Sequence, residues 1–337
     1  MLNTYIVEVI DTFQPDEMEA FEFFLDSPYF NRGSNAEKLK KLFSLIVDAK
    51  QNPDLLTKDA VYKNIFQNKS VVDGKLDKLI SELKKYLQIF LEVQRYRSIE
   101  REDQRTLDLL AELRTRGLEE RYFQTLDKIK RKIANRKEET LENHQLQHKI
   151  AIEEYDWAST YNKVKGDLSI PAVITQLDKN YFIERTIMLT TLKLQQKVII
   201  IPQSIDHADA WIIPEDQIKQ SLLLQISWKI HALLSIKTPS SEQFQDLLQL
   251  LQYNEDKIGR QHLVEFYTHL RNFCTILIDN GHYEFRVVLH QIQRDNLERG
   301  YFYFDGLIPS SAFLNITQVA LMVGEQQWAI AFVEQHK

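Results

Sequence analysis

The sequence predicts an all-α protein, in which an N-terminal helical unit is followed by antiparallel helical hairpins stacked in a repeat-like array. Glycine and proline are scarce, with 9 and 8 among 337 residues, whereas average usage would give roughly 24 and 17. Sheets and βα-alternating folds depend on turns that are rich in these residues, so the shortage argues against both. Apolar residues instead recur at helical spacing along most of the chain.

Residues 1–97 are expected to form the N-terminal helical unit. Pro15 suits a first helical position and is followed by two acidic residues, which the helix dipole favours there. Pro28 ends this helix, because the residue before a proline is pushed out of the helical region. Ser34 or Asn35, Thr57 and Asp73 are the candidate starts of the next three helices.

Residues 98–237 are expected to form a region of long, charged helices, with a loop at 198–214 between two prolines. The helix that begins near Ile170 carries apolar residues on two faces, so we expect it to be covered on two sides. The first face holds Ile170, Val173, Ile174, Leu177, Tyr181, Met188 and Leu192. The second face holds Ile183, Ile187 and Leu194.

Apolar periodicity predicts further helices at 215–236, 240–253, 260–280, 283–299 and 310–323. Residues 238–337 are expected to form helical hairpins. The stretch around Gly281, with Cys274 on an apolar stripe and a Gly-x-Tyr turn, resembles the first helix and turn of a tetratricopeptide repeat. Arg286 departs from that pattern, since a small residue is usual there. A second, similar hairpin surrounds Gly324, and it lacks the turn tyrosine. The resemblance implies stacked antiparallel helices.

The N-terminus resembles a family of uncharacterised bacterial all-helical proteins. Its members contain an F-L-x-S-P-F/Y-F-N motif, matched here at residues 24–31, and a later segment matched by residues 57–66. The resemblance implies a helical architecture and a bacterial origin, with no assigned activity. Its members are longer chains, which implies that this sequence is the front part of a longer helical-repeat protein.

Charge and composition exclude several classes of protein. The net charge is −6, which disfavours a general binder of nucleic acids or anionic membranes. Cys274 is the single cysteine, so no internal disulfide is possible and a reducing cytoplasm is the expected location. No apolar run is long enough to span a bilayer. Because Gly-rich phosphate loops are also absent, we expect no metal or nucleotide cofactor.

Two motifs are interpreted as structural. The string Ser27-Pro28-Tyr29-Phe30-Asn31 stops a helix, and we expect Tyr29 and Phe30 to be buried with Asn31 bonded to local backbone; the alternative is a partner-docking loop. His144 and His148 lie four residues apart, as zinc ligands can. Their polar neighbours favour a solvated helix face instead.

A basic segment at 128–137 is the candidate for nucleic-acid binding. Its positive side chains include Lys130, Arg131, Lys132 and Arg136. Two isoleucines of the segment belong to a core stripe, and no aromatic residue interleaves the charges, so a solvated helix face is the favoured interpretation.

Three functions follow, of which we favour a non-catalytic scaffold that binds a protein or peptide partner in a groove between helices. The alternatives are an enzyme with a helical active site near the 198–214 loop, where His207 and Trp211 lie, and a nucleic-acid binder. Trp328 and Phe332 share one face of the last helix. We expect part of that face to be exposed and to permit self-association.

Overall fold

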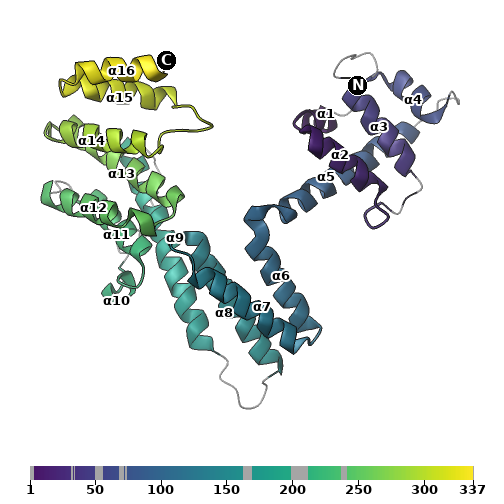
Figure 1. Cartoon of the computed structure of the whole chain (residues 1–337), viewed down its shortest axis with the longest axis horizontal. Coiled ribbons are helices and arrows are strands. Elements are labelled where there is room, and N and C mark those ends of the chain that lie inside the picture. The colour runs from purple at the N-terminus through teal and green to yellow at the C-terminus, as the bar shows by residue number, and fades with distance from the viewer. Residues whose placement is uncertain are drawn as a thin grey trace. The chain divides into compact units, whose positions relative to one another are not determined.

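The all-α prediction is confirmed. The computed structural model describes residues 4–31, 33, 35–49, 56–67, 72, 74–161, 169–198, 212–236 and 241–336. Helices make up 81% of this part of the chain (Figure 1), and within it β-structure is limited to two isolated bridges. None of the helices in these ranges combines the length and the apolar composition that crossing a membrane requires.

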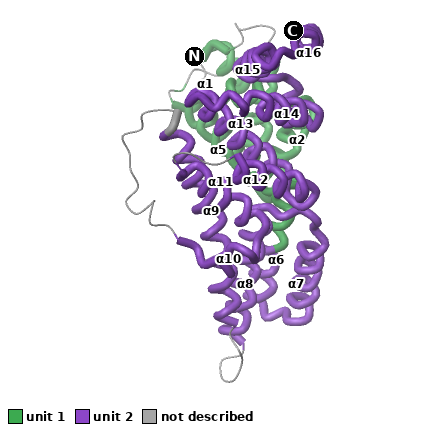
Figure 2. Tube along the Cα trace, turned by 90° about the vertical axis from the view of Figure 1, so that its left-hand side faces the viewer, with its two compact units in different colours: residues 1–106 green, residues 107–337 purple. Residues whose placement is uncertain are grey.

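The chain divides into two compact units, residues 1–106 and 107–337 (Figure 2). Each unit has its own buried hydrophobic residues, and within the described ranges no core cluster combines residues of both units. The finer division predicted at residues 97 and 237 stays a prediction, as does the repeat-like arrangement of the hairpins.

Unit 1 is a bundle of short helices around the long helix α5. Its helices are α1 (Thr4–Asp11), α2 (Pro15–Asp26), α3 (Ala36–Asp48), α4 (Lys58–Phe66), α5 (Lys75–Arg97) and the 3₁₀ turn η2 (Ile99–Arg101). Phe21 of α2 is fully buried and its ring contacts Phe43 of α3 and Phe90 of α5 at centroid distances of 5.0 and 5.1 Å. Two predicted helix starts are confirmed: Pro15 is the first residue of α2, and the Thr57 side chain accepts a hydrogen bond from Ala60. Asn35 precedes α3 without a capping bond from its side chain, and Ser34 and Asp73 lie outside the described residues.

The helix stop after α2 differs from the prediction at one aromatic residue. Tyr29 is 76% exposed, so its predicted burial is wrong, and Phe30 is half-buried, stacked on Phe24 at 4.6 Å. The residue that holds the turn is Asn31, which is buried as expected of a backbone-bonding side chain. Its amide donates to the carbonyl of Leu25 (2.9 Å), while its oxygen accepts hydrogen bonds from the Gly33 amide and the Tyr86 hydroxyl, each at 3.1 Å. One polar side chain therefore fixes the chain reversal, and Tyr29, two residues earlier, is left exposed.

Unit 2 begins within α6 (Glu102–Thr115), which continues from unit 1, and contains the remaining helices. These are α7 (Glu119–Ala134), α8 (Leu141–Tyr161), α9 (Ile170–Val198), α10 (Glu215–Ile218), α11 (Leu222–Ser235), α12 (Ser241–Tyr253), the 3₁₀ turn η3 (Glu255–Lys257), α13 (Arg260–Asp279), α14 (Phe285–Glu298), α15 (Ser310–Met322) and α16 (Gln326–His336). α9 packs against both α8 and α11, and α13 to α16 contact one another in succession. In Figure 1 the pairs α13–α14 and α15–α16 follow one another toward the C-terminus.

Only one of the two predicted faces of α9 is covered. Ile183, Ile187 and Leu194 belong to the core that α9 shares with α11 to α14. The other face is open, so the expectation that α9 is covered on two sides is wrong for its first stripe. Five of its apolar residues are exposed: Ile170, Ile174, Leu177, Tyr181 and Met188. An apolar stripe on a helix predicts burial only if a neighbouring element of the described chain reaches it.

Candidate functional site

Two basic side chains of the 128–137 segment bond to residues of α8. Ile129 and Ile133 are buried in the core of α6 to α8, as the stripe predicted. Lys130 forms an ion pair with Glu154 of α8, and the Arg136 guanidinium donates to the Asn143 side chain. Arg131 and Lys132 are exposed. The engaged side chains support the solvated-face interpretation of residues 128–137.

His144 is buried, which corrects its assignment to a solvated face. Its Nε2 atom lies 2.6 Å from Oε1 of Glu139, in the segment between α7 and α8. The hydroxyl of Ser221 donates to the same carboxylate at 2.5 Å. The backbone amides of Leu222 and Leu223, in the first turn of α11, donate to its other oxygen at 2.9 and 3.2 Å. Glu139 thus neutralises the N-terminus of α11, where a carboxylate is favoured by the free amides and the helix dipole.

The electrostatics of Glu139 follow from these bonds. Burial pushes the pKa of Glu139 upward, but the hydrogen bonds from His144 and Ser221 and the amide of Leu223 outweigh it and bring the pKa to about 2. The carboxylate is therefore ionised at neutral pH. In sequence nothing distinguishes Glu139 from its exposed neighbour Glu138, so the residue was not predicted as important.

The Glu139 cluster lacks the geometry of a catalytic nucleophile and base. Both Ser221 and His144 are hydrogen-bonded to the carboxylate, and the Ser221 oxygen accepts a bond from the Leu224 amide as the N-cap of α11. A serine nucleophile of a catalytic triad would instead bond directly to the histidine that acts as its base. Cys274 is fully buried on α13, and burial raises the pKa of its thiol, which fits the predicted packing role. Among the described residues no cluster of histidine, cysteine and acidic side chains could hold a metal ion.

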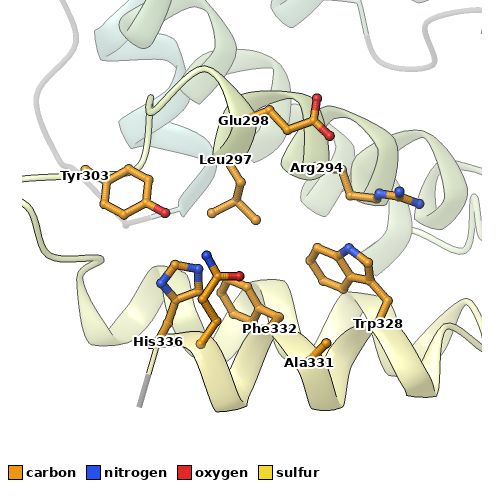
Figure 3. A pocket seen from close by; sticks show the side chains of 9 residues that line it. Arg294, Leu297, Glu298, Tyr303, Trp328, Ala331, Phe332 and His336 are labelled. Carbon is orange, nitrogen blue, oxygen red and sulfur yellow. The ribbon is translucent and has the colours of Figure 1, made fainter.

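The α14/α16 pocket brings Trp328 and Phe332 together. Their rings stack at 5.4 Å on one face of α16 and point toward Arg294 and Leu297 of α14 (Figure 3). Its volume is about 240 Å³, which is below the usual range for ligand sites. Phe332 is only 4% exposed and Trp328 is half-buried against His290, so the expected exposure is wrong for Phe332. The covering groups come from Phe302, Phe313 and α14 of the same chain.

The α13/α15 groove is the larger concave feature of unit 2, with a volume of about 680 Å³. One wall is a single face of α13 that carries Val264, Thr268, Arg271, Thr275 and Asp279. The opposite wall is formed by the connection to α15 and by its first turns, which carry Tyr301, Phe302, Phe304, Ser311, Ala312 and Asn315. No sequence pattern predicts this groove, because its walls are more than twenty residues apart and only packing brings them together.

The predicted sites are not all in the described part of the chain. Trp211 and His207, with most of the 198–214 loop, lie outside the described residues, so the enzyme alternative stays a prediction. The basic residues of α7 and the aromatic pair of α16 belong to different helices, and no described pocket includes members of both sets. Comparison of the chain with protein-family models, curated proteins and solved structures finds no match. The resemblance of the N-terminal motif to a bacterial helical family therefore remains a prediction.

Proposed function

We propose that the protein is a non-catalytic helical scaffold that binds a segment of a partner protein in the α13/α15 groove. The single observation that supports this is the groove itself, whose volume of about 680 Å³ lies within the range of functional sites. Its walls combine exposed aromatic groups with amide and hydroxyl groups. Phe304, which is 76% exposed, and Tyr301 supply the apolar contacts, while Asn272 and Asn315 supply hydrogen-bonding groups.

The dimensions of the groove fit a peptide. The α13 wall extends from Val264 to Asp279, which at 1.5 Å per residue is about 22 Å. An extended segment of about seven residues has that length. Successive side chains of an extended peptide point in opposite directions, so alternate side chains would face the groove.

Peptide selection on the full chain tests this function. Random dodecapeptides are selected on the immobilised protein, and the affinity of the selected peptides is measured by fluorescence polarisation. Asn272→Trp and Ser311→Trp place a bulky group at exposed groove positions, and each should weaken binding about tenfold or more. Val287→Trp, at an exposed position of α14 outside the groove, is the matched control.

The control separates the groove from the rest of the surface. Val287→Trp should leave the affinity within about twofold of the unaltered chain. Peptides that bind all three variants as well as the unaltered chain would place the binding site elsewhere and contradict the proposal.

A further inference from the structure

Arg271 lies midway along the groove wall of α13 and is held there by neutral groups. One Nη atom donates to the side-chain oxygen of Asn296 on α14, and the other donates to the Thr268 hydroxyl at 2.8 Å. The guanidinium also lies over the ring of Phe302, 4.3 Å from its centroid. These three contacts fix its position without supplying a negative charge.

The charge of Arg271 is not compensated within the described chain. No carboxylate of the described residues lies within ion-pair distance of it. Asp279 is on the same wall but two turns further along α13, a rise of about 12 Å. Burial lowers the pKa of Arg271 to about 10, so the side chain remains a cation at neutral pH.

Another half-buried arginine of unit 2 shows the usual arrangement. Arg114 of α6 donates two hydrogen bonds to Glu153 at 2.7 and 3.3 Å, and Asp156 lies 3.5 Å away. A guanidinium removed from water normally has such a partner, because an uncompensated buried charge is costly. The side chain of Arg271 is likewise held in place by two hydrogen bonds. It lines the groove, however, and does not face a carboxylate.

The groove around Arg271 favours an anion that comes from a ligand. The oxygen of Asn315 accepts a bond from Gln293 at 2.8 Å, so the donor end of that amide is what remains for a ligand. The apolar side chains of Phe302 and Ile276 line the same space, and an apolar lining strengthens a charge-assisted hydrogen bond. Groove-lining residues continue along α13 on both sides of Arg271, so a bound chain passes over it instead of ending there.

We propose that Arg271 anchors the carboxylate of an aspartate or glutamate side chain within the partner segment that occupies the α13/α15 groove. The assignment rests on the proposed function, and it adds that the partner segment is acidic at its centre. A planar guanidinium and a carboxylate form two parallel hydrogen bonds, which fixes the register of the bound segment.

A double-mutant cycle tests this assignment. The selected dodecapeptides, synthesised with an amidated C-terminus, should share an acidic residue, and its replacement by the corresponding amide should weaken binding to the unaltered protein by about 10- to 100-fold. The same replacement should change binding to Arg271→Gln by less than about twofold. Arg271→Lys keeps the charge and loses the planar fork, so its affinity should fall between the two.

Other results would contradict either the role of Arg271 or the kind of carboxylate that it binds. If Ser311→Trp weakens binding of the selected peptides but these peptides share no acidic residue, the role proposed for Arg271 is wrong and the proposed function still holds. Binding that is lost when the C-terminus is amidated would make the terminal carboxylate the anchor and overturn the side-chain assignment. If Arg271→Gln fails to fold, the amide replacement measured against the unaltered protein decides, because no effect of that replacement contradicts the proposal. Arg294→Gln on α14, outside the groove, is the control and should bind normally.

Discussion

At the scale of single residues, Glu139 connects several helices of unit 2. Its carboxylate receives hydrogen bonds from α8 through His144 and from the start of α11 through Ser221 and Leu222. Its backbone forms a parallel bridge with Ile258, just before α13. Three helices are therefore positioned by one side chain and its peptide group. Loss of the negative charge would leave the first amides of α11 with a neutral and therefore weaker acceptor.

Glu139→Gln should lower the free energy of unfolding of unit 2 by about 3 kcal/mol at neutral pH, which corresponds to the difference between its ordinary and folded-state pKa. The folded pKa of about 2 lies below the ordinary value of 4.5. The contribution is therefore complete above pH 4.5 and is lost as the pH falls toward 2. Urea unfolding can be followed by tryptophan fluorescence, since all four tryptophans lie in residues 107–337.

The pH dependence distinguishes this effect from a packing defect. The difference between the unaltered chain and Glu139→Gln should shrink as the pH approaches 2. Glu138→Gln, at the exposed neighbouring position, should remain within about 0.5 kcal/mol at every pH. A constant difference across the pH range would show that ionisation of Glu139 is not the cause.

At the scale of elements, local sequence signals predicted where helices begin and end. Which faces of these helices are buried depends on long-range packing. Helices expected at 240–253, 260–280 and 310–323 correspond to α12, α13 and α15 within one residue at each end, because their boundaries are set by nearby caps and turns. The helix expected at 215–236 is broken into α10 and α11, where Ser221 caps the second helix. The exposed stripe of α9 and the covered face of α16 could not be predicted from the sequence. Whether a helix face is covered depends on its packing against other elements, which local sequence does not show.

The candidate site shows the same limit. Arg271 looks in sequence like one charge within an apolar stripe, between Leu270 and Phe273. Its importance comes from Asn296 and Phe302, which belong to other elements and leave its charge uncompensated. Trp328 and Phe332 were singled out correctly as neighbours on one face, but their pocket depends on α14.

Phe332 connects α16 to its neighbours, because it is buried in a cluster with Phe302 and Ile316 and stacks with Phe313 of α15. Phe332→Ala should cost about 3–5 kcal/mol, as expected for a buried aromatic residue, and should reduce the hydrogen-exchange protection of α16. Ile330→Ala is the matched control, because Ile330 is on the same helix and 59% exposed. Equal protection in the two variants would mean that Phe332 does not hold the helix in place.

At the scale of the whole molecule, the two units have separate cores and can be distinguished by spectroscopy. Unit 1 contains no tryptophan, whereas far-ultraviolet circular dichroism reports on the helices of both units. A substitution in the core of unit 1 is therefore expected to change one signal and leave the other unaffected.

Asn31→Ala removes the hydrogen bonds to Leu25, Gly33 and Tyr86, and it should destabilise unit 1 by about 2–3 kcal/mol. In urea unfolding, the part of the circular dichroism transition that unit 1 contributes should move to a lower urea concentration. The midpoint of the tryptophan fluorescence transition, which reports on unit 2, should stay the same. Tyr29→Ala, at the exposed position two residues earlier, should alter neither curve. A shift of both transitions in Asn31→Ala would show that the units unfold together.

The contact between the start of α8 and α13 has a consequence for synthesis on the ribosome. The Leu141 amide donates to His262, 121 residues further along the chain, and Gly259 at this contact has no room for a Cβ atom, which would lie 2.5 Å from Thr140. Closing so long a segment costs entropy, and it must wait until α13 has emerged from the exit tunnel. We therefore expect α6 to α8 to acquire their own core early in translation, while the start of α11 becomes protected only after the C-terminal helices emerge. Nascent chains halted before residue 260 should accordingly be cleaved by protease near Ser221 and resist cleavage within α7.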